Sequence, residues 1–246
     1  MKQNNPKDIP KTTYIDHNNF MLVEPDTKIS KHLSNHKSLS AKCKPLFDSM
    51  GLNSGKGLAI DLGAFVGDTT TYFLENGYDE VIAVEADPIH FKCLSYNCPA
   101  STNINCVISS DSGEDYMRDK YDDATKCKST GTHRNPGSLV FGEKNEKLGE
   151  NWFYKDVIKS MTLDDITSNV DSCSVLKMDI QGFEVDALKG GLNFIKRCKP
   201  IIFSEVDVSC LSHRGYTKED LINLILSLGY DIKNSGRHDI LFVPNA

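Results

Sequence analysis

Four acidic residues stand directly after short apolar runs, and this pattern can bring their carboxylates together. These acids are Asp61, Glu85, Asp179 and Glu205. In an open sheet of parallel strands, ligands bind at the carboxyl ends of the strands, so the four carboxylates would share one edge. There they could accept hydrogen bonds from a sugar, take a proton from a hydroxyl group or bind a cation.

A glycine turn follows the first apolar run, between Ala59 and Asp68. Gly63 and Gly67 let a ligand approach the backbone closely, and the amides that open the following helix favour anionic groups. The G-x-x-x-G spacing differs from the dinucleotide fingerprint G-x-G-x-x-G, and the turn lacks the Lys-Ser or Lys-Thr pair of a P-loop. On its own, such a turn is equally typical of a tight strand–helix connection that binds nothing.

Glu85 follows Gly63 by about twenty residues and ends the next apolar run, where a carboxylate can accept hydrogen bonds from both hydroxyls of a ribose. The turn and this acid together predict a ligand that contains adenosine. The acid alone is also typical of a solvated strand end. The residues that we expect to bind the cofactor are Asp61, Gly63, Gly67, Glu85, Ala86, Ser110 and Asp179.

Apolar runs alternate with helical patterns from Gly57 to the end of the chain. Helices are expected at about 67–76 and at 217–228, where the second begins with a capping box. Such alternation predicts an α/β fold with a doubly wound, mostly parallel sheet. The strands are expected at 58–60, 81–84, 104–108, 174–178, 201–203 and 240–243.

Two segments interrupt this pattern. Residues 1–30 are polar and predict a loose arm or a segment that orders only on a partner. Residues 37–50 have the apolar spacing of a helix, so we expect an N-terminal region at 1–50 and a single domain at 51–246. Between residues 113 and 151 the sequence becomes charged and irregular. This insertion is expected either to cover the substrate site or to form a solvated loop.

Composition limits the partners and the location. The net charge of −6 argues against a nucleic-acid partner. The eight cysteines include no C-x-x-C pair, which favours reduced, structural thiols. We find no secretory signal and no run of eighteen apolar residues, so the sequence predicts a cytoplasmic protein without a membrane span.

Five short motifs resemble those of the FkbM family of methyltransferases in order and spacing, over about residues 57–206. The resemblance implies a Rossmann-like, seven-stranded class I methyltransferase fold that binds S-adenosylmethionine (SAM) and methylates hydroxyl groups of sugars, glycans or polyketides. The family usually has Glu at the position of Gln181 and often has Asn at the position of Phe65. The motifs are Asp61-Leu62-Gly63, Val84-Glu85, Thr162-Leu163-Asp164-Asp165, the stretch from Lys177 to Glu184, and Ala187-Leu188-Lys189-Gly190.

Methyl transfer to an oxygen requires an aligned donor and acceptor and the removal of the hydroxyl proton. Asp179 is the first candidate for the base, with Glu205 beside it as the second catalytic candidate. In one alternative, Asp179 only positions the methionine end of SAM. In another, Asp179, Glu205 and Asp207 hold Mg²⁺ or Mn²⁺, with His213 on the same edge, and the metal lowers the hydroxyl pKa.

The leading hypothesis is a SAM-dependent O-methyltransferase whose acceptor is a small molecule or a glycan. Two other functions stay open. An NAD-dependent oxidoreductase would also use Glu85, although the glycine spacing is against it. A non-catalytic protein that binds SAM would be compatible with Gln181, although the retained acids are against it. The sequence indicates neither the identity of the acceptor nor the oligomeric state.

Overall fold

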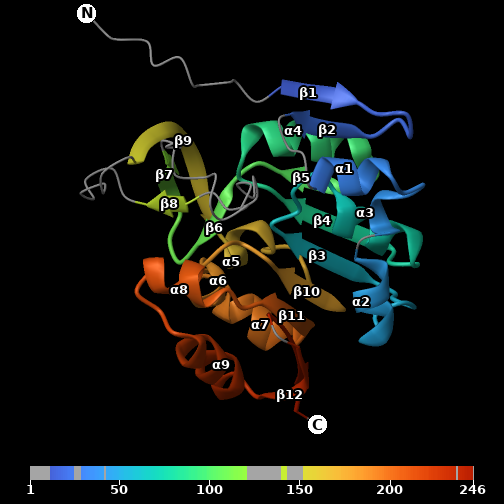
Figure 1. The fold of residues 1–246 in the computed structure, drawn as a ribbon. Coiled ribbons are helices and arrows are strands. Elements are labelled where there is room, and N and C mark those ends of the chain that lie inside the picture. Colours follow the sequence, from blue (N-terminus) through green and yellow to red (C-terminus); the bar gives the residue numbers. More distant parts are fainter. Residues whose placement is uncertain are drawn as a thin grey trace, which may run out of the picture.

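The computed structural model describes residues 12–24, 29–41, 43–120, 140–142, 152–236 and 238–245. At its centre lies a seven-stranded sheet with the order β12-β13-β11-β10-β3-β4-β5 (Figure 1). β13 pairs antiparallel with both of its neighbours, and the other pairs are parallel. The strands are β3 (Leu58–Leu62), β4 (Glu80–Val84), β5 (Thr102–Ile104), β10 (Val175–Met178), β11 (Ile201–Glu205), β12 (Tyr230–Ser235) and β13 (Asp239–Pro244). The expected α/β fold with a mostly parallel sheet is confirmed.

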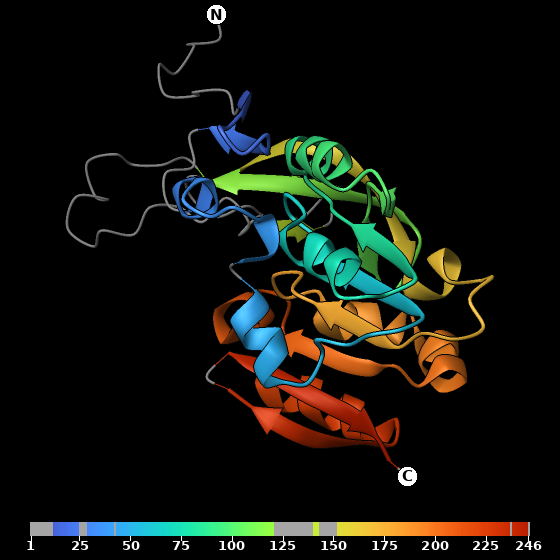
Figure 2. The same cartoon turned by 90° about the vertical axis from the view of Figure 1, so that its right-hand side faces the viewer.

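Helices cover both faces of this sheet (Figures 1 and 2). One face packs against α5 (Leu163–Ile166), α6 (Glu184–Lys189), α7 (Leu192–Cys198), α8 (Val208–His213) and α9 (Lys218–Ser227). The other packs against α2 (Lys44–Ser49), α3 (Asp68–Glu75) and α4 (Pro88–Asn97). Because both faces are covered, all five residues of β3 are buried, as expected for a central parallel strand. No helix within the described ranges is long and apolar enough to cross a membrane.

Aromatic side chains fill the core between the sheet and α2. The ring of Phe47 lies 5.0 Å from that of Tyr72, 5.6 Å from that of Phe73 and 4.9 Å from that of Phe203, between centroids. The helix expected at 37–50 is shorter than predicted. It consists of α2, which is preceded by the 3-10 turn η1 (Leu39–Ala41). Its apolar side chains secure the N-terminal region to the sheet.

A second sheet lies beside the first and has the order β6-β9-β7-β8. Its strands are β6 (Val107–Ser109), β7 (Gly113–Lys120), β8 (Val140–Gly142) and β9 (Trp152–Thr162). The prediction of a single strand at 104–108 is wrong, because β5 ends at Ile104 in the first sheet and β6 belongs to the second sheet. The side-chain amide of Asn105 donates to the carbonyl oxygens of Glu85 and Ala86, which turns the chain away from β4.

The insertion expected at 113–151 is partly regular, since β7 and β8 lie within it. Residues 121–139 and 143–151, where the lid was expected, lie outside the described residues.

The expected loose arm contains a hairpin of β1 (Thr12–Ile15) and β2 (Met21–Glu24), followed by α1 (Ile29–Ser34). Asn97 at the end of α4 fixes this hairpin: its side chain accepts from Met21 N at 2.8 Å and donates to Met21 O at 2.9 Å. The prediction of a loose arm is therefore wrong for residues 12–24. Residues 1–11 and 25–28 lie outside the described part of the chain.

Candidate functional site

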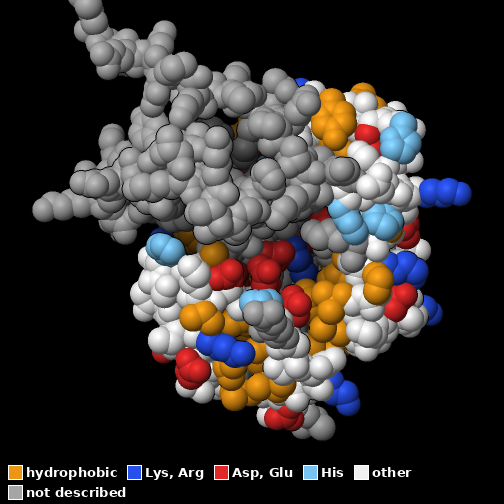
Figure 3. Space-filling model, viewed as in Figure 1, with side chains coloured by type: hydrophobic (Ala, Val, Ile, Leu, Met, Phe, Trp, Pro, Cys, Tyr) orange, Lys and Arg blue, Asp and Glu red, His pale blue; other side chains and the backbone are white. Residues whose placement is uncertain are grey.

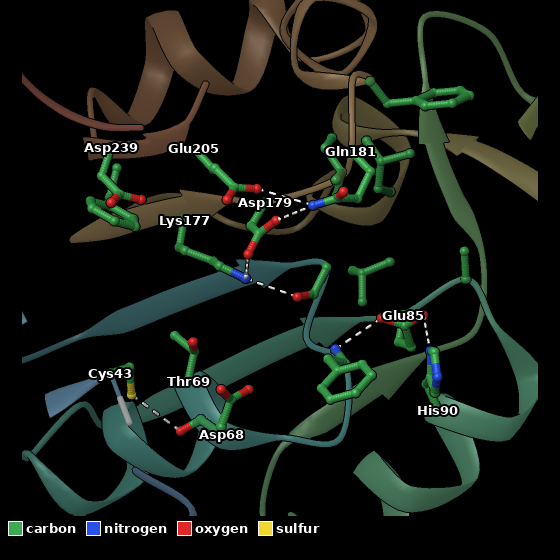
Figure 4. A pocket seen from close by; sticks show the side chains of 18 of the residues that line it. Cys43, Asp68, Thr69, Glu85, His90, Lys177, Asp179, Gln181, Glu205 and Asp239 are labelled. Atoms are coloured by element: carbon green, nitrogen blue, oxygen red, sulfur yellow. Dashed lines mark hydrogen bonds and ion pairs between the residues drawn. The ribbon is translucent and has the colours of Figure 1, made fainter. Parts of the chain in front are cut away.

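A cavity of about 290 Å³ opens at the carboxyl ends of β3, β4, β10 and β11 (Figure 4). In the space-filling view, acidic side chains gather near the centre of the face, next to a basic one (Figure 3). Polar and apolar groups both line the cavity, which is typical of sites for small ligands. The polar side chains that line it are Asp68, Thr69, Glu85, His90, Lys177, Asp179, Gln181, Glu205 and Asp239.

Glu85 supports the glycine turn at one end of the cavity. Its Oε2 accepts a hydrogen bond of 2.8 Å from Phe65 N, and its Oε1 accepts one of 2.8 Å from Asp87 N. Phe65 has a φ of 52°, in the left-handed region that Asn tolerates better than Phe. The bond to Glu85 helps to hold this conformation. Each carboxylate oxygen keeps a second lone pair, which can accept from a ribose hydroxyl.

His90 packs behind Glu85. Its Nδ1 lies 3.7 Å from Glu85 Oε1, and its ring meets that of Phe65 edge-on with the centroids 4.6 Å apart. The side chain is 1% exposed, so it supports the carboxylate from within the protein. The sequence prediction missed this residue, because it lies in the first turns of α4 rather than at a strand end.

The two glycines of the turn have different roles. A Cβ on Gly63 would lie 1.9 Å from the carbonyl oxygen of Asp179, so only glycine lets this turn pack against the end of β10. A Cβ on Gly67 would lie 2.6 Å from Cys98 Sγ. Gly67 does not line the cavity, and its role here is to let the start of α3 pack against the end of α4.

Asp61 is fully buried and does not line the cavity. It accepts hydrogen bonds from Thr70 Oγ1 at 2.7 Å and forms an ion pair of 3.0 Å with Lys177 Nζ. Lys177 Nζ also donates to Gly63 O at 2.8 Å and lies 3.9 Å from Asp179 Oδ2. Burial lowers the pKa of Lys177, but the charges of Asp61 and Asp179 outweigh it, so the net pKa is raised. The lysine thus links the turn to both acids.

The side chains of Asp179 and Glu205 meet at the opposite end of the cavity, as expected from adjacent strands. The amide of Gln181 donates to Asp179 Oδ1 at 2.9 Å and to Glu205 Oε2 at 3.0 Å (Figure 4). Burial, a hydrogen bond with Asp179 and the charge of Asp179 raise the pKa of Glu205 to about 9. At neutral pH Glu205 therefore keeps its proton.

Three expected site residues lie apart from this pair. Asp207 caps α8, where its Oδ1 accepts from Ser209 N at 2.8 Å and from Cys210 N at 3.0 Å. His213 is exposed and lies at the end of α8, and Ser110 does not line the cavity. Across the residues that the structure describes, no three or more His, Cys, Asp or Glu side chains are arranged to hold a metal ion. The structure thus brings Asp179 and Glu205 together but places Asp207, the third predicted metal ligand, at the start of α8.

Other residues at the site come from segments that the sequence alone does not bring together. Cys43 and Phe47 reach the cavity from the N-terminal region, Phe203 from within β11, and Asp239 from the start of β13. Burial and the charge of Asp179 raise the pKa of Asp239. Among these unpredicted residues, Lys177 could have been found from the sequence, because it is a charged side chain within an apolar strand.

Comparisons with known proteins agree with this geometry. A family model described as the methyltransferase FkbM domain matches residues 61–232. The crystal structure of methyltransferase FkbM from Methylobacillus flagellatus is similar at a TM-score of 0.50 and 20% identity, over 87% of this chain and 51% of that one. This chain thus spans about half the length of that protein. The crystal structure of a TehB-like SAM-dependent methyltransferase from Corynebacterium glutamicum is similar at a TM-score of 0.43 and 12% identity. The match covers 89% of this chain and 96% of that one. No curated protein matches.

Replacing Lys177 with Met should destabilise the fold by about 3–5 kcal/mol, because Asp61 would stay buried without its counter-charge. Urea unfolding at neutral pH measures this change. The double variant Asp61→Asn, Lys177→Met is the matched control, since it removes both charges and should recover part of the loss. A single-variant loss below about 1 kcal/mol would contradict a structural role for the pair.

Replacing Glu205 with Gln should change how stability depends on pH. The pKa of Glu205 is about 9 in the folded state, so the folded protein keeps this proton up to about pH 9, whereas the unfolded state releases it near the ordinary glutamate pKa of 4.5. Folding stability of the original protein therefore falls as pH rises through this window, and the variant should escape that fall. Urea unfolding at several pH values tests this, with the exposed Glu219→Gln as the control. Parallel curves for Glu205→Gln and the original protein would refute the assignment.

Proposed function

Because this chain belongs to the FkbM methyltransferase domain family and uses SAM as its cofactor, we propose that it methylates a hydroxyl oxygen of a small molecule or glycan. The observation that carries this proposal is the pair of Asp179 and Glu205 at the opposite end of the cavity from Glu85. A base is what a hydroxyl acceptor needs, because an alcohol is a weak nucleophile until its proton is removed.

The cavity fits the cofactor by the chemistry of its lining. Glu85 would accept the hydroxyls of the ribose, and Ala86, Val107 and Ile108 offer apolar surface next to it. When bound, SAM supplies a methyl group on a sulfonium that leaves as a neutral thioether.

Asp179 has the position and exposure of a base. Its side chain is 38% exposed, whereas that of Lys177 beside it is 5% exposed, so Asp179 is the charged group that an acceptor can reach. The acceptor proton would move to a carboxylate oxygen of Asp179, while the protonated Glu205 carries no second negative charge. This assignment favours Asp179 as the catalytic base over a role in positioning alone.

The lining also favours an acceptor without negative charge. Asp68, Asp179 and Asp239 all face the same cavity, and the one lysine among its lining residues is already paired with Asp61. An anionic acceptor such as a sugar phosphate or a nucleic acid would be repelled there. A neutral sugar or glycoside fits, and the apolar rings of Phe47 and Phe203 can pack against it.

The two other hypotheses have less support. An NAD-dependent oxidoreductase does not account for the family, and a non-catalytic SAM-binding protein does not account for an acid–base pair at the cavity. We also propose a cytoplasmic location, since the seven cysteines of the described residues are free and reduced thiols fit that compartment. The role of residues 113–151 as a lid stays a proposal.

The direct test of the function is incubation with SAM and a panel of neutral glycosides, phosphorylated sugars and nucleic acids, followed by mass spectrometry. We expect methylated neutral glycosides, with loss of the product when SAM is omitted. Methylation restricted to amines, phosphates or nucleic acids would contradict the proposal.

Replacing Glu85 with Ala should weaken SAM binding by at least about tenfold, because the ribose would lose charge-assisted hydrogen bonds worth about 1.5–3 kcal/mol each at most. Isothermal titration calorimetry measures the dissociation constant. Glu80→Ala, an exposed acid at the start of the same strand, is the control. An unchanged affinity in Glu85→Ala would remove the ribose assignment, and tight NADH binding without SAM binding would favour the oxidoreductase.

Replacing Asp179 with Asn should lower turnover by roughly 10²–10⁴-fold, the usual contribution of a general base. The dissociation constant of SAM should stay within a few-fold, because Asn keeps the shape of the side chain. Steady-state kinetics with the acceptor found in the panel checks both. Full activity of Asp179→Asn with normal SAM binding would mean that neither acid acts as a base.

A further inference from the structure

Gln181 lies between the two acids of the proposed active site, in the turn that follows β10. Its Nε2 is 2.9 Å from Asp179 Oδ1 and 3.0 Å from Glu205 Oε2. A side-chain amide carries two N–H donors on one nitrogen, so each carboxylate receives one of them. The two hydrogen bonds join the ends of β10 and β11 through one side chain (Figure 4).

The orientation of this amide follows from its neighbours. Cys210 Sγ lies 3.6 Å from Gln181 Oε1, so the thiol donates to the carbonyl end. The opposite orientation would place that oxygen 2.9 Å from the acceptor Asp179 Oδ1 and would leave the Cys210 thiol without this acceptor. The hydrogen-bond network thus assigns the nitrogen to the side of the acids.

The backbone conformation of the turn fixes the position from which the Gln181 side chain extends. Gln181 has a φ of 54° and Gly182 a φ of 102°, so the turn runs through two left-handed residues in succession. A Cβ on Gly182 would lie 2.5 Å from the carbonyl oxygen of Cys210, which shows how closely the turn packs against α8. A turn held this closely leaves the side chain little freedom to move away from the acids.

The chemical alternative at this position is a carboxylate of the same shape. Glutamate would place a third set of oxygens beside Asp179 and Glu205, and a set of three carboxylates is the kind of site that hard divalent cations prefer. Glutamine instead places N–H donors in the gap. An amide nitrogen about 3 Å from both carboxylates lies where a cation that bridged them would have to be.

We propose that Gln181 is a positioning residue whose amide takes the place of a bridging cation, so that Asp179 and Glu205 work as a metal-free acid–base pair. The proposal rests on the proposed function for the role of the pair. Where a glutamate would add a third negative charge, the amide of Gln181 provides two hydrogen bonds.

The first test is binding of Mn²⁺ to the full chain, followed by electron paramagnetic resonance and calorimetry. The original protein should bind Mn²⁺ only weakly at this site, and Gln181→Glu should bind it at least about tenfold more tightly, because a third carboxylate completes the ligand set. Adding Glu205→Gln to that variant should abolish the gain. Retained SAM affinity shows that each variant is folded.

Two results of this experiment would overturn the proposal. One is tight Mn²⁺ binding by the original protein that Glu205→Gln abolishes, since the cation would then enter beside the amide. The other is a folded Gln181→Glu variant that gains no affinity. Neither result depends on the acceptor, so a failure to find a methylated product would count against the proposed function alone.

The second test uses Gln181→Met, which keeps the length of the side chain and removes both donors. With the acceptor found in the panel, its turnover should fall by about tenfold or more, because the base is no longer held in place. The Michaelis constant for SAM should not change. The original protein should keep its full rate in EDTA, whereas Gln181→Glu should respond to added Mn²⁺. Loss of the original activity in EDTA, or full turnover of Gln181→Met, would reject the positioning role.

Discussion

The buried ion pair of Lys177 and Asp61 is the interaction on which the site depends. It joins β10 to β3 at the centre of the sheet, and the same ammonium donates to the carbonyl oxygen of Gly63. The lysine therefore fixes the glycine turn relative to Asp179, which lies two residues further along the chain, directly after β10. Both ends of the cavity take their positions from this one pair, although Lys177 itself is almost inaccessible.

Glu85 and Glu205 have different surroundings and therefore different roles at the site. Glu85 is engaged by backbone amides and holds a turn, so its remaining lone pairs face the cavity in a fixed direction. Glu205 is half-buried next to another acid and keeps its proton. Residues of one chemical type thus act as a hydrogen-bond acceptor at one end and as a neutral partner at the other, because burial and neighbours set their charge.

Much of the fold could be predicted from the sequence, since the apolar runs that end at Asp61, Glu85, Asp179 and Glu205 are strands of one sheet. The predictions failed where long-range contacts decide the structure. The amide of Asn105 divides one expected strand between two sheets. β12 was missed because five of its six residues are exposed and it lacks a run of apolar residues. The alternative in which Asp207 binds a metal did not anticipate that its carboxylate caps a helix.

Two non-glycine residues that line the cavity, Phe65 and Gln181, have left-handed backbones, which cost folding free energy. Each conformation costs on the order of 1 kcal/mol, and the rest of the fold must compensate for both. Selection for thermal stability alone would favour Gly or Asn at these positions. A more heat-resistant variant obtained in that way would lose the aromatic ring beside Glu85 or the amide between the two acids, so a gain in stability at these positions would remove contacts that shape the cavity.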